Sequence, residues 1–480
     1  MDNETQNSNK FKGEKNNDVP HLTENNASSS QEKYPHKDSF EIGGEDLLQK
    51  IEVKDKEYEI FEDIRIRIGT LLKADTLSIL LGAGASVDCG GVLLGTIPIA
   101  VEQALLKKGI TGKTMPKIRR WLMLFYLAAR YCCANSSPVT RRAILERLNQ
   151  MNRGDIEPLK ANFEQVISQL HRWRFSLPEK GDRLKIYGSP NLDAKAEDIN
   201  AAIENATNSL ANACKLPTDN KNIGLTTYKT MVRKLLTRPL NLRRINVFTL
   251  NYDTLVEQAA DAEGVVLLDG FVGTQRRVFR PESYDQDLYF PAETTEGRVH
   301  RFDRVLHLYK LHGSITWQAS DPTIDNPYGV EFASFNINSS ARLLIYPTPA
   351  KYGETLGLPY SELFRRFATA IVRPQSVLFA IGYGFGDEHV NAIIRQALAV
   401  PSFILVIVDP DPKSNFVQTL QKRPDHRVWI VKGPSIGTFE GFVNKILPDL
   451  QEDEIRKKVL ATYRALVKNA DAKGITYDGK

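Results

Sequence analysis

The stretch RRINVFTLNYDTLVEQAA, Arg243–Ala260, contains the two signals that decide the fold. Its apolar part, INVFTL, is short and continuous, which is typical of a β-strand buried on both faces of a parallel sheet. The apolar run stops at Asn251-Tyr252-Asp253, and apolar residues then recur with the spacing of a helix. A buried strand that leads directly into a helix predicts an α/β protein.

Length and composition predict a folded protein with more than one structural unit. The chain has 480 residues, of which 42% are hydrophobic and 25% charged. The formal net charge of +5 is small for this length and does not demand nucleic acid as the main ligand. The longest apolar helical run, WLMLFYLAA, is far shorter than the ~20 residues that span a bilayer. The polar N-terminus lacks the apolar stretch of a secretory signal, so we expect a cytoplasmic protein without a membrane segment.

Several apolar runs predict the strands of one sheet, and helical segments lie between many of them. This alternation predicts a Rossmann-like, mostly parallel sheet flanked by helices. The runs are TLSILL, INVFTL, VLHLYKL, SVLFAI, FILVIV and RVWIV.

The pattern also divides the chain into regions. The first is rich in Asn, Ser, Lys and Glu, so it buries too little apolar surface to order itself. Within the later part, residues 265–304 are expected to form a long irregular or hairpin excursion. The expected regions are a disordered polar tail (1–44), the start of the Rossmann-like domain (45–96), a helical insert (97–240), the remainder of the Rossmann-like domain (241–450), and a basic C-terminal helix and tail (451–480).

Small or polar residues follow five of the predicted strands. In an open parallel sheet, ligands bind beyond the carboxyl ends of the strands, so these residues are expected to converge on one edge. They are Gly82–Ser86, Asn251–Asp253, His312–Ser314, Gly382–Asp387 and Asp409.

The first of these segments, GAGAS, is a glycine turn between a strand and a helix. Gly82 and Gly84 allow backbone N–H groups to approach a diphosphate, and a helix N-terminus favours negative charge. The stricter dinucleotide pattern has a third glycine where this chain has Val87, and glycines in tight turns are also common without any ligand.

The segment NYDTLVEQ combines a capping signal with a residue that capping does not explain. Thr254 and Glu257 fit a capping box, and Asp253 could itself cap the helix. Asn251 lies too early for that role. Its amide offers both a donor and an acceptor, as a ribose hydroxyl or a water requires.

His312 is the best candidate for a general base. Histidine titrates near neutrality, and Gly313 beside it leaves room for a substrate, although a single histidine at a strand end is frequently structural. His307 points to the opposite strand face and is expected to be structural. In the later turn GYGFGD, Asp387 is expected to cap the following helix, and the glycines could pass close to a nucleoside.

Taken in order, these motifs resemble the sirtuin family. GAGAS resembles its first NAD-binding loop, TLNYD its T-Q-N-I-D segment, and LHGS the segment that bears its catalytic histidine. GYGFGD takes the place of its Gly-Thr-Ser nucleotide loop. The resemblance covers about residues 76–92 and 245–410.

Two departures from the family narrow the expected activity. Family deacylases carry paired C-x-x-C zinc ligands after the histidine, whereas the last of the four cysteines here is Cys214. The stretch VDCGGVLLGTIPIA stands in place of their P-D-F-R segment. We therefore expect no zinc. The pattern is more similar to the divergent bacterial sirtuin-like proteins of antiphage defence, which hydrolyse NAD⁺ and some of which act with a HerA-type ATPase.

The resemblance implies a site built around NAD⁺ as the substrate. Asn251 would hold the ribose and a water, Asp253 would contact the nicotinamide carboxamide, and His312 would act as general base. Since an unregulated NAD⁺ hydrolase would kill its own cell, a homo-oligomer, a partner or an inhibitory segment is expected to control it. The residues implied in binding the rest of the dinucleotide are Gly82, Ala83, Gly84, Ser86, Gly313, Ser314, Gly382, Gly384 and Asp409.

Other functions are compatible with the same sequence. One is a sirtuin-type protein deacylase or ADP-ribosyltransferase on the same scaffold. Another is a module that senses NAD⁺ or ADP-ribose without chemistry. A third is DNA binding through a cluster of arginines, although such clusters are usually solvated faces. These arginines are Arg276, Arg277, Arg280, Arg298, Arg301 and Arg304.

Overall fold

The computed structural model describes most of the chain between residues 38 and 451. The described ranges are 38–50, 57–91, 97–112, 116–133, 138–157, 163–177, 183–187, 191–214, 223–290, 300–333, 342–344 and 358–451, with the single residues 159, 161 and 216.

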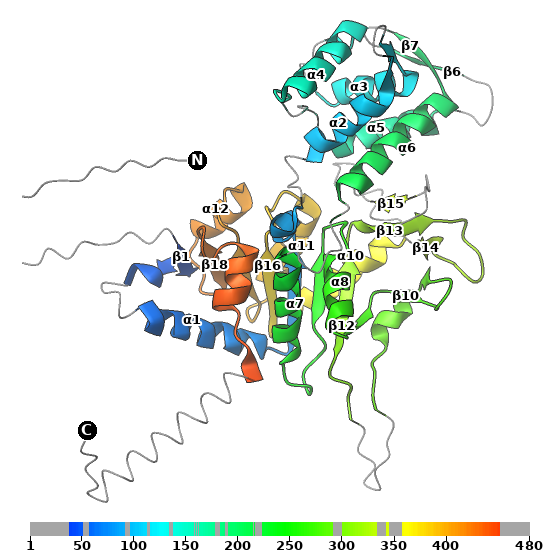
Figure 1. Ribbon diagram of the computed structural model, residues 1–480. Helices are drawn as coiled ribbons and strands as arrows, with labels where there is room; N and C mark the ends of the chain where they lie inside the picture. Colours follow the sequence, from blue (N-terminus) through cyan, green and yellow to red (C-terminus); the bar gives the residue numbers. More distant parts are fainter. Residues whose placement is uncertain are drawn as a thin grey trace, which may run out of the picture. The chain divides into compact units, whose positions relative to one another are not determined.

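A nine-stranded, mostly parallel sheet organises the Rossmann-like part of the chain (Figure 1), which confirms the predicted fold class. The strand order is β2-β1-β18-β17-β16-β3-β8-β12-β9, and every neighbouring pair from β18 to β9 is parallel. The strands are β1 (Ser39–Ile42), β2 (Glu45–Asp46), β3 (Thr76–Leu81), β8 (Asn246–Thr249), β9 (Val266–Leu268), β12 (Val305–Lys310), β16 (Ser376–Ile381), β17 (Ile404–Val408) and β18 (Val428–Lys432).

Helices cover both faces of this sheet, because alternate strand residues point to opposite faces and both sets are apolar. In β3, Ile79 packs into one core and Leu80 into the other. The first core contains residues of α1 (Glu57–Leu72), α7 (Ile223–Leu236), α8 (Leu255–Ala262), α13 (Phe439–Gly441) and η5 (Phe442–Ile446). The second contains residues of α10 (Tyr360–Ile371), α11 (Glu388–Leu398) and α12 (Asn415–Gln421).

The described residues between 97 and 213 are mainly helical, and their apolar side chains form a third hydrophobic core, which Tyr252 and Ile315 also join. One of these helices, Arg141–Arg153, is capped by Thr140, whose side chain accepts from Ala143 N at 3.1 Å. The elements are α2 (Ile97–Gly109), α3 (Arg120–Tyr131), α4 (Arg141–Arg153), α5 (Phe163–Phe175) and α6 (Ala196–Ala213), with the strand pairs β4 (Ile110–Thr111) and β5 (Lys117–Ile118), and β6 (Arg183–Ile186) and β7 (Leu192–Lys195).

A second sheet, antiparallel and five-stranded, was not predicted from the sequence. Two of its five strands lie within residues 265–304, the expected irregular or hairpin excursion, and they pair with each other antiparallel. Strand β9 from the same region joins the large sheet. Its strand β13 begins at Gly313, so the chain leaves β12, turns at Leu311-His312 and enters another strand. In spatial order the strands are β10 (Phe271–Val272), β11 (Val278–Phe279), β14 (Val330–Phe332), β13 (Gly313–Ala319) and β15 (Arg342–Leu344).

The predictions for the two ends of the chain have different outcomes. Within residues 1–44, expected to be a disordered tail, β1 pairs with β18 and buries Phe40 completely. A single large aromatic side chain and a partner strand suffice to order four residues there. Residues 1–37 and 452–480, which include the expected basic C-terminal helix, lie outside the described residues.

Candidate functional site

The strand ends converge as predicted, because the sheet pairs these strands in parallel and in register. Leu81, the last residue of β3, lies beside Thr249 of β8, which in turn lies beside Lys310 of β12. On the other side, Ile381 of β16 lies between Leu81 and Val408. Neighbouring strands are about 5 Å apart, so the segments that follow them share one carboxyl edge.

The two glycine turns on this edge pack backbone against backbone. Gly84 N donates to Gly382 O at 2.9 Å, and a Cβ atom on Gly84 would lie only 2.7 Å from Gly382 Cα. Gly382 also has φ +61°, which disfavours any side chain. The contact between the turns therefore requires glycine at these positions, whether or not they also bind a diphosphate. The turn after β3 leads into a short 3-10 helix, η3 (Ala83–Cys89), in which Ala83 is partly exposed.

Ser86 is the centre of a buried hydrogen-bond network. Its hydroxyl donates to Asp253 Oδ2 at 2.7 Å and accepts from Asn251 Nδ2 at 2.9 Å. Tyr228 Oη lies 3.2 Å from the same oxygen and must be the donor, because Ser86 has given its only hydrogen to Asp253. The hydroxyl of Ser86 thus orients Asn251 and Asp253, and the diphosphate-binding role expected of this residue stays a prediction. Tyr228, on α7, carried no sequence signal of this role.

Asn251 joins the first glycine turn to the end of β8. Its Nδ2 group donates to Gly82 O at 2.9 Å as well as to Ser86, so both amide hydrogens are used. Within the described part of the chain, no hydrogen bond reaches its Oδ1 atom. The side chain is partly exposed, and it therefore presents a fixed acceptor at the edge of the sheet.

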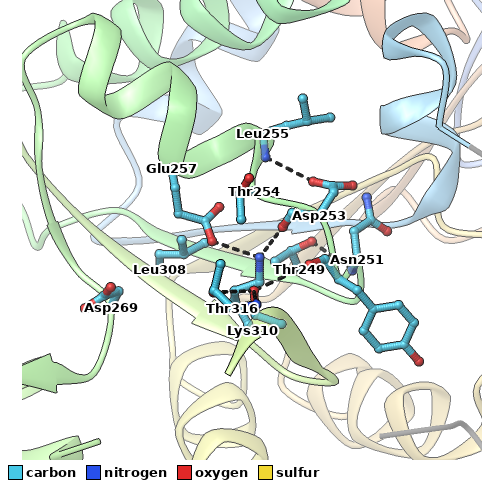
Figure 2. Close-up of polar contacts among 12 residues, drawn as sticks. Thr249, Asn251, Asp253, Thr254, Leu255, Glu257, Asp269, Leu308, Lys310 and Thr316 are labelled. Carbon is cyan, nitrogen blue, oxygen red and sulfur yellow. Dashed lines mark hydrogen bonds and ion pairs between the residues drawn. The ribbon is translucent and has the colours of Figure 1, made fainter. Parts of the chain in front are cut away.

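Asp253 is held from both sides (Figure 2). Its Oδ1 atom accepts from Leu255 N at 3.1 Å, and its backbone carbonyl accepts from the buried ammonium of Lys310. The predicted capping box is wrong: Thr254 makes no side-chain cap, and Glu257 pairs with Lys310 Nζ at 2.8 Å. The box fails because the buried ammonium is a stronger partner for the Glu257 carboxylate than a backbone N–H.

Lys310 is a functional-site neighbour that the sequence did not single out. It is 3% exposed, and only its position inside an apolar strand signalled something unusual. Burial raises the pKa of Glu257, and the Lys310 charge opposes that shift. No hydrogen bond from the described residues reaches the other carboxylate oxygen of Glu257, the buried Oε2. The ion pair therefore holds the Lys310 ammonium against the backbone carbonyl of Asp253.

His312 lies at the turn between β12 and β13 and is 4% exposed. Its Nε2 atom is 3.1 Å from Asp387 Oδ2, and Asp387 is also buried. The ring lies near the rings of Tyr252 and Phe364, with centroid separations of 6.5 and 6.3 Å. Asp387 was predicted as the cap of α11, and it does accept from His389 N at 3.0 Å.

The remaining predicted residues differ in their surroundings. Gly313 has φ +83°, which the sharp turn requires. Ser314 is fully buried, with its hydroxyl 2.9 Å from Thr316 Oγ1, so it supports the turn. A Cβ atom on Gly384 would meet nothing within 4 Å, and its surroundings are open. Asp409 is partly buried, accepts from Asp411 N at 2.8 Å, and has its pKa raised by burial.

The arginines considered as a DNA-binding cluster are engaged within the chain. Arg276, Arg277 and Arg301 pair with carboxylates. Arg280 and Arg304 donate to backbone carbonyls, and Arg298 lies outside the described residues. These contacts favour a structural role for the group.

The part of the chain that the structure describes contains neither a candidate metal site nor a membrane-spanning helix. No group of three or more His, Cys, Asp or Glu side chains there could hold a metal ion. None of the described helices is both long enough and apolar enough to cross a bilayer.

Residues 245–427 match the family model of the SIR2-like domain. This segment contains Asn251, Asp253, His312 and Asp387, and the match supports NAD⁺-dependent activity of the sirtuin type, with NAD⁺ as the substrate. No curated protein matches the chain in sequence.

Among solved structures, the chain is similar to a mutant Sir2 homologue in complex with 2′-O-acetyl ADP ribose. The alignment covers 81% of this chain and 96% of that one, with 10% sequence identity and a TM-score of 0.33.

Proposed function

We propose that this protein is an NAD⁺ hydrolase that cleaves the bond between nicotinamide and ribose to give nicotinamide and ADP-ribose. One observation carries the proposal beyond the domain match. Asn251, Asp253 and His312 come from two neighbouring strand ends, and each is held in one orientation by buried partners. Such fixed polar groups at the carboxyl edge are suited to a reaction that needs positioning.

The chemistry requires little acid assistance at the leaving group. When the bond from nicotinamide to ribose C1′ breaks, its electron pair stays on nicotinamide, which departs neutral. The ribose then resembles an oxocarbenium ion, as in glycoside hydrolysis. The free Oδ1 acceptor of Asn251 is suited to a ribose hydroxyl or to the attacking water, and His312 takes the proton as water adds to C1′.

Water is proposed as the acceptor in place of an acyl-lysine. The chain has no cysteine beyond Cys214, so it lacks the paired zinc ligands that family deacylases carry after the histidine. The described strands of the five-stranded antiparallel sheet also lack such ligands. These features argue against the module that accompanies peptide recognition.

We further propose that the activity serves bacterial antiphage defence by depleting NAD⁺. The sequence features that resemble defence proteins are NYD and LHGS. A HerA-type ATPase as partner and assembly into a homo-oligomer belong to this proposal, because the hydrolase must be silent in an uninfected cell.

The direct test is incubation of the purified full chain with NAD⁺, alone and with an ATPase encoded beside it. Release of nicotinamide and ADP-ribose in equal amounts, measured by chromatography, would support the proposal. Release that requires an acylated peptide would indicate a deacylase, and transfer of ADP-ribose to protein would indicate a transferase. Tight NAD⁺ binding without turnover under every condition would favour a sensing module and overturn the proposal.

A further inference from the structure

Asp387 divides its two carboxylate oxygens between two tasks. Oδ1 accepts from His389 N at 3.0 Å and from Val390 N at 3.4 Å, which caps α11. Oδ2 lies 3.1 Å from His312 Nε2. The cap leaves the second oxygen no freedom, because rotating the side chain toward solvent would release both backbone N–H groups.

The loop that carries Asp387 is anchored at several points. It begins at Gly382, which packs against the first glycine turn. Asn391, almost fully buried, donates from Nδ2 to Phe385 O at 2.9 Å and accepts from Tyr383 Oη at 3.0 Å.

Phe385 is held in a left-handed conformation with φ +52°, and its ring stacks on Phe416 at 5.0 Å. Strained backbone of this kind persists only where the surroundings hold it, so Asp387 meets His312 with little freedom.

The chemistry of the pair then determines where the imidazole is basic. An ionised carboxylate can only accept, so Nε2 of the neutral ring must carry the hydrogen. The lone pair is left on Nδ1. We propose that Asp387 is a positioning residue that holds His312 as its Nε2–H tautomer, making Nδ1 the atom that accepts the proton. The inference rests on the proposed hydrolysis for its consequence in catalysis, but the tautomer itself is independent of it.

Asp387→Asn is the substitution that separates this role from helix capping. Asparagine caps helices as well as aspartate does, so its oxygen stays on the two backbone N–H groups of α11. Its NH2 group then faces His312 and forces the ring to accept at Nε2 and carry its hydrogen on Nδ1. The fold is retained, whereas the base is lost.

A matched control comes from Asp46, whose Oδ1 atom also accepts two backbone N–H groups, from Phe40 at 3.1 Å and Leu48 at 3.0 Å. Asp46→Asn makes the same change of charge at a cap-like carboxylate on the far side of the sheet, at β2. It is expected to leave NAD⁺ cleavage and the His312 ring unchanged.

The experiment combines ring nitrogen-15 NMR of histidine-labelled full chain with the NAD⁺ cleavage assay. The His312 signals are identified by their loss in His312→Gln. We expect the parent to show hydrogen on Nε2, and Asp387→Asn to show it on Nδ1 and to lose about 10²- to 10⁴-fold in kcat, the usual contribution of a general base. Urea midpoints of the parent and the variant should agree.

The outcomes separate this inference from the proposed function. A parent with hydrogen on Nδ1, or an Asp387→Asn variant with an unchanged ring, overturns the inference. A shifted tautomer together with kcat within a few-fold of the parent also overturns the claim that Nδ1 accepts the proton. If the parent never cleaves NAD⁺ but its tautomer shifts as expected, the orienting role stands and hydrolysis fails.

Discussion

Strand β12 brings together two histidines that the same fold treats in opposite ways. His312, just beyond its carboxyl end, lies 3.1 Å from a carboxylate that is itself fixed. Among the described residues, His307, within the strand, has one hydrogen-bonding contact, a long one from Nδ1 to Tyr309 Oη at 3.4 Å, and no hydrogen bond reaches its buried Nε2 atom. Burial lowers the pKa of His307 to about 4, so it stays neutral. The partner, and not the residue type, decides which histidine can do chemistry.

The largest expected effect separates the two histidines by activity. His312→Ala removes the proposed base and should lower kcat for NAD⁺ cleavage about 10²- to 10⁴-fold. His307→Phe should leave it within a few-fold, since His307 lies inside β12, three residues before the carboxyl end of the strand. Asn251→Ala should also abolish cleavage, with the exposed Asn415→Ala as control. Equal rates in His312→Ala and the parent would remove His312 from the mechanism.

The next prediction concerns the buried ion pair between Lys310, at the carboxyl end of β12, and Glu257. Lys310→Met leaves Glu257 buried without its cation and should cost about 3–5 kcal/mol of unfolding free energy, as broken buried pairs do. The double variant Lys310→Met/Glu257→Leu should recover most of the loss, because it removes both charges. Urea unfolding of the single and double variants measures this. A single-variant loss below about 1 kcal/mol would mean that the pair is solvated.

A smaller effect concerns the pH dependence of stability at His307. Its pKa is about 4 in the fold against 6.5 for an ordinary histidine, so the protonated ring is disfavoured by folding. Its stabilising contribution is therefore complete above pH 6.5 and is lost as pH falls toward 4. The integrated loss is about 3 kcal/mol.

The measurement is the difference in unfolding free energy between the parent and His307→Phe from neutral pH to pH 4. Phenylalanine does not titrate, so the parent should lose about 3 kcal/mol of unfolding free energy relative to the variant on acidification. Parallel curves over this range would show that His307 ionises freely in the fold.

The smallest effect removes the weak partner of His307. Tyr309→Phe deletes the hydroxyl that lies 3.4 Å from its Nδ1 atom, while the ring can keep its stacking on Phe248 and Tyr284. We expect a loss of about 1 kcal/mol, the net value of one hydrogen bond, and unchanged NAD⁺ cleavage. A loss in activity comparable to that of Asp387→Asn would erase the contrast between the histidines.

The central sheet was predictable because its strands are buried on both faces. A continuous apolar run such as SVLFAI has few other uses, and a polar residue directly after it marks the carboxyl edge. The antiparallel sheet escaped prediction because four of its five strands have only two or three residues each. Strand β1 escaped because four residues between polar neighbours give too little periodicity to recognise.

The sequence allowed the candidate site residues to be identified, but not the hydrogen bonds and ion pairs between them. Asp387 was recognisable as a helix cap from its neighbours, yet its second oxygen meets His312, which lies 75 residues earlier. Likewise, Glu257 matches a capping pattern locally but finds Lys310, 53 residues later. Contacts of this range depend on the order of strands in the sheet, which sequence pattern alone does not give.

The close approach of the two glycine turns also makes substitution at one a problem for both. Any side chain at position 84 collides with Gly382, and any side chain at 382 is disfavoured by φ +61° as well. Gly382 starts the loop that ends at Asp387. A substitution at either glycine would therefore displace Asp387 and disturb the orientation of the His312 ring, although neither glycine contacts that ring. If positions 84 and 382 are randomised, folded and active variants should have glycine at both. Variants that fold with another residue at either position should have a lowered kcat.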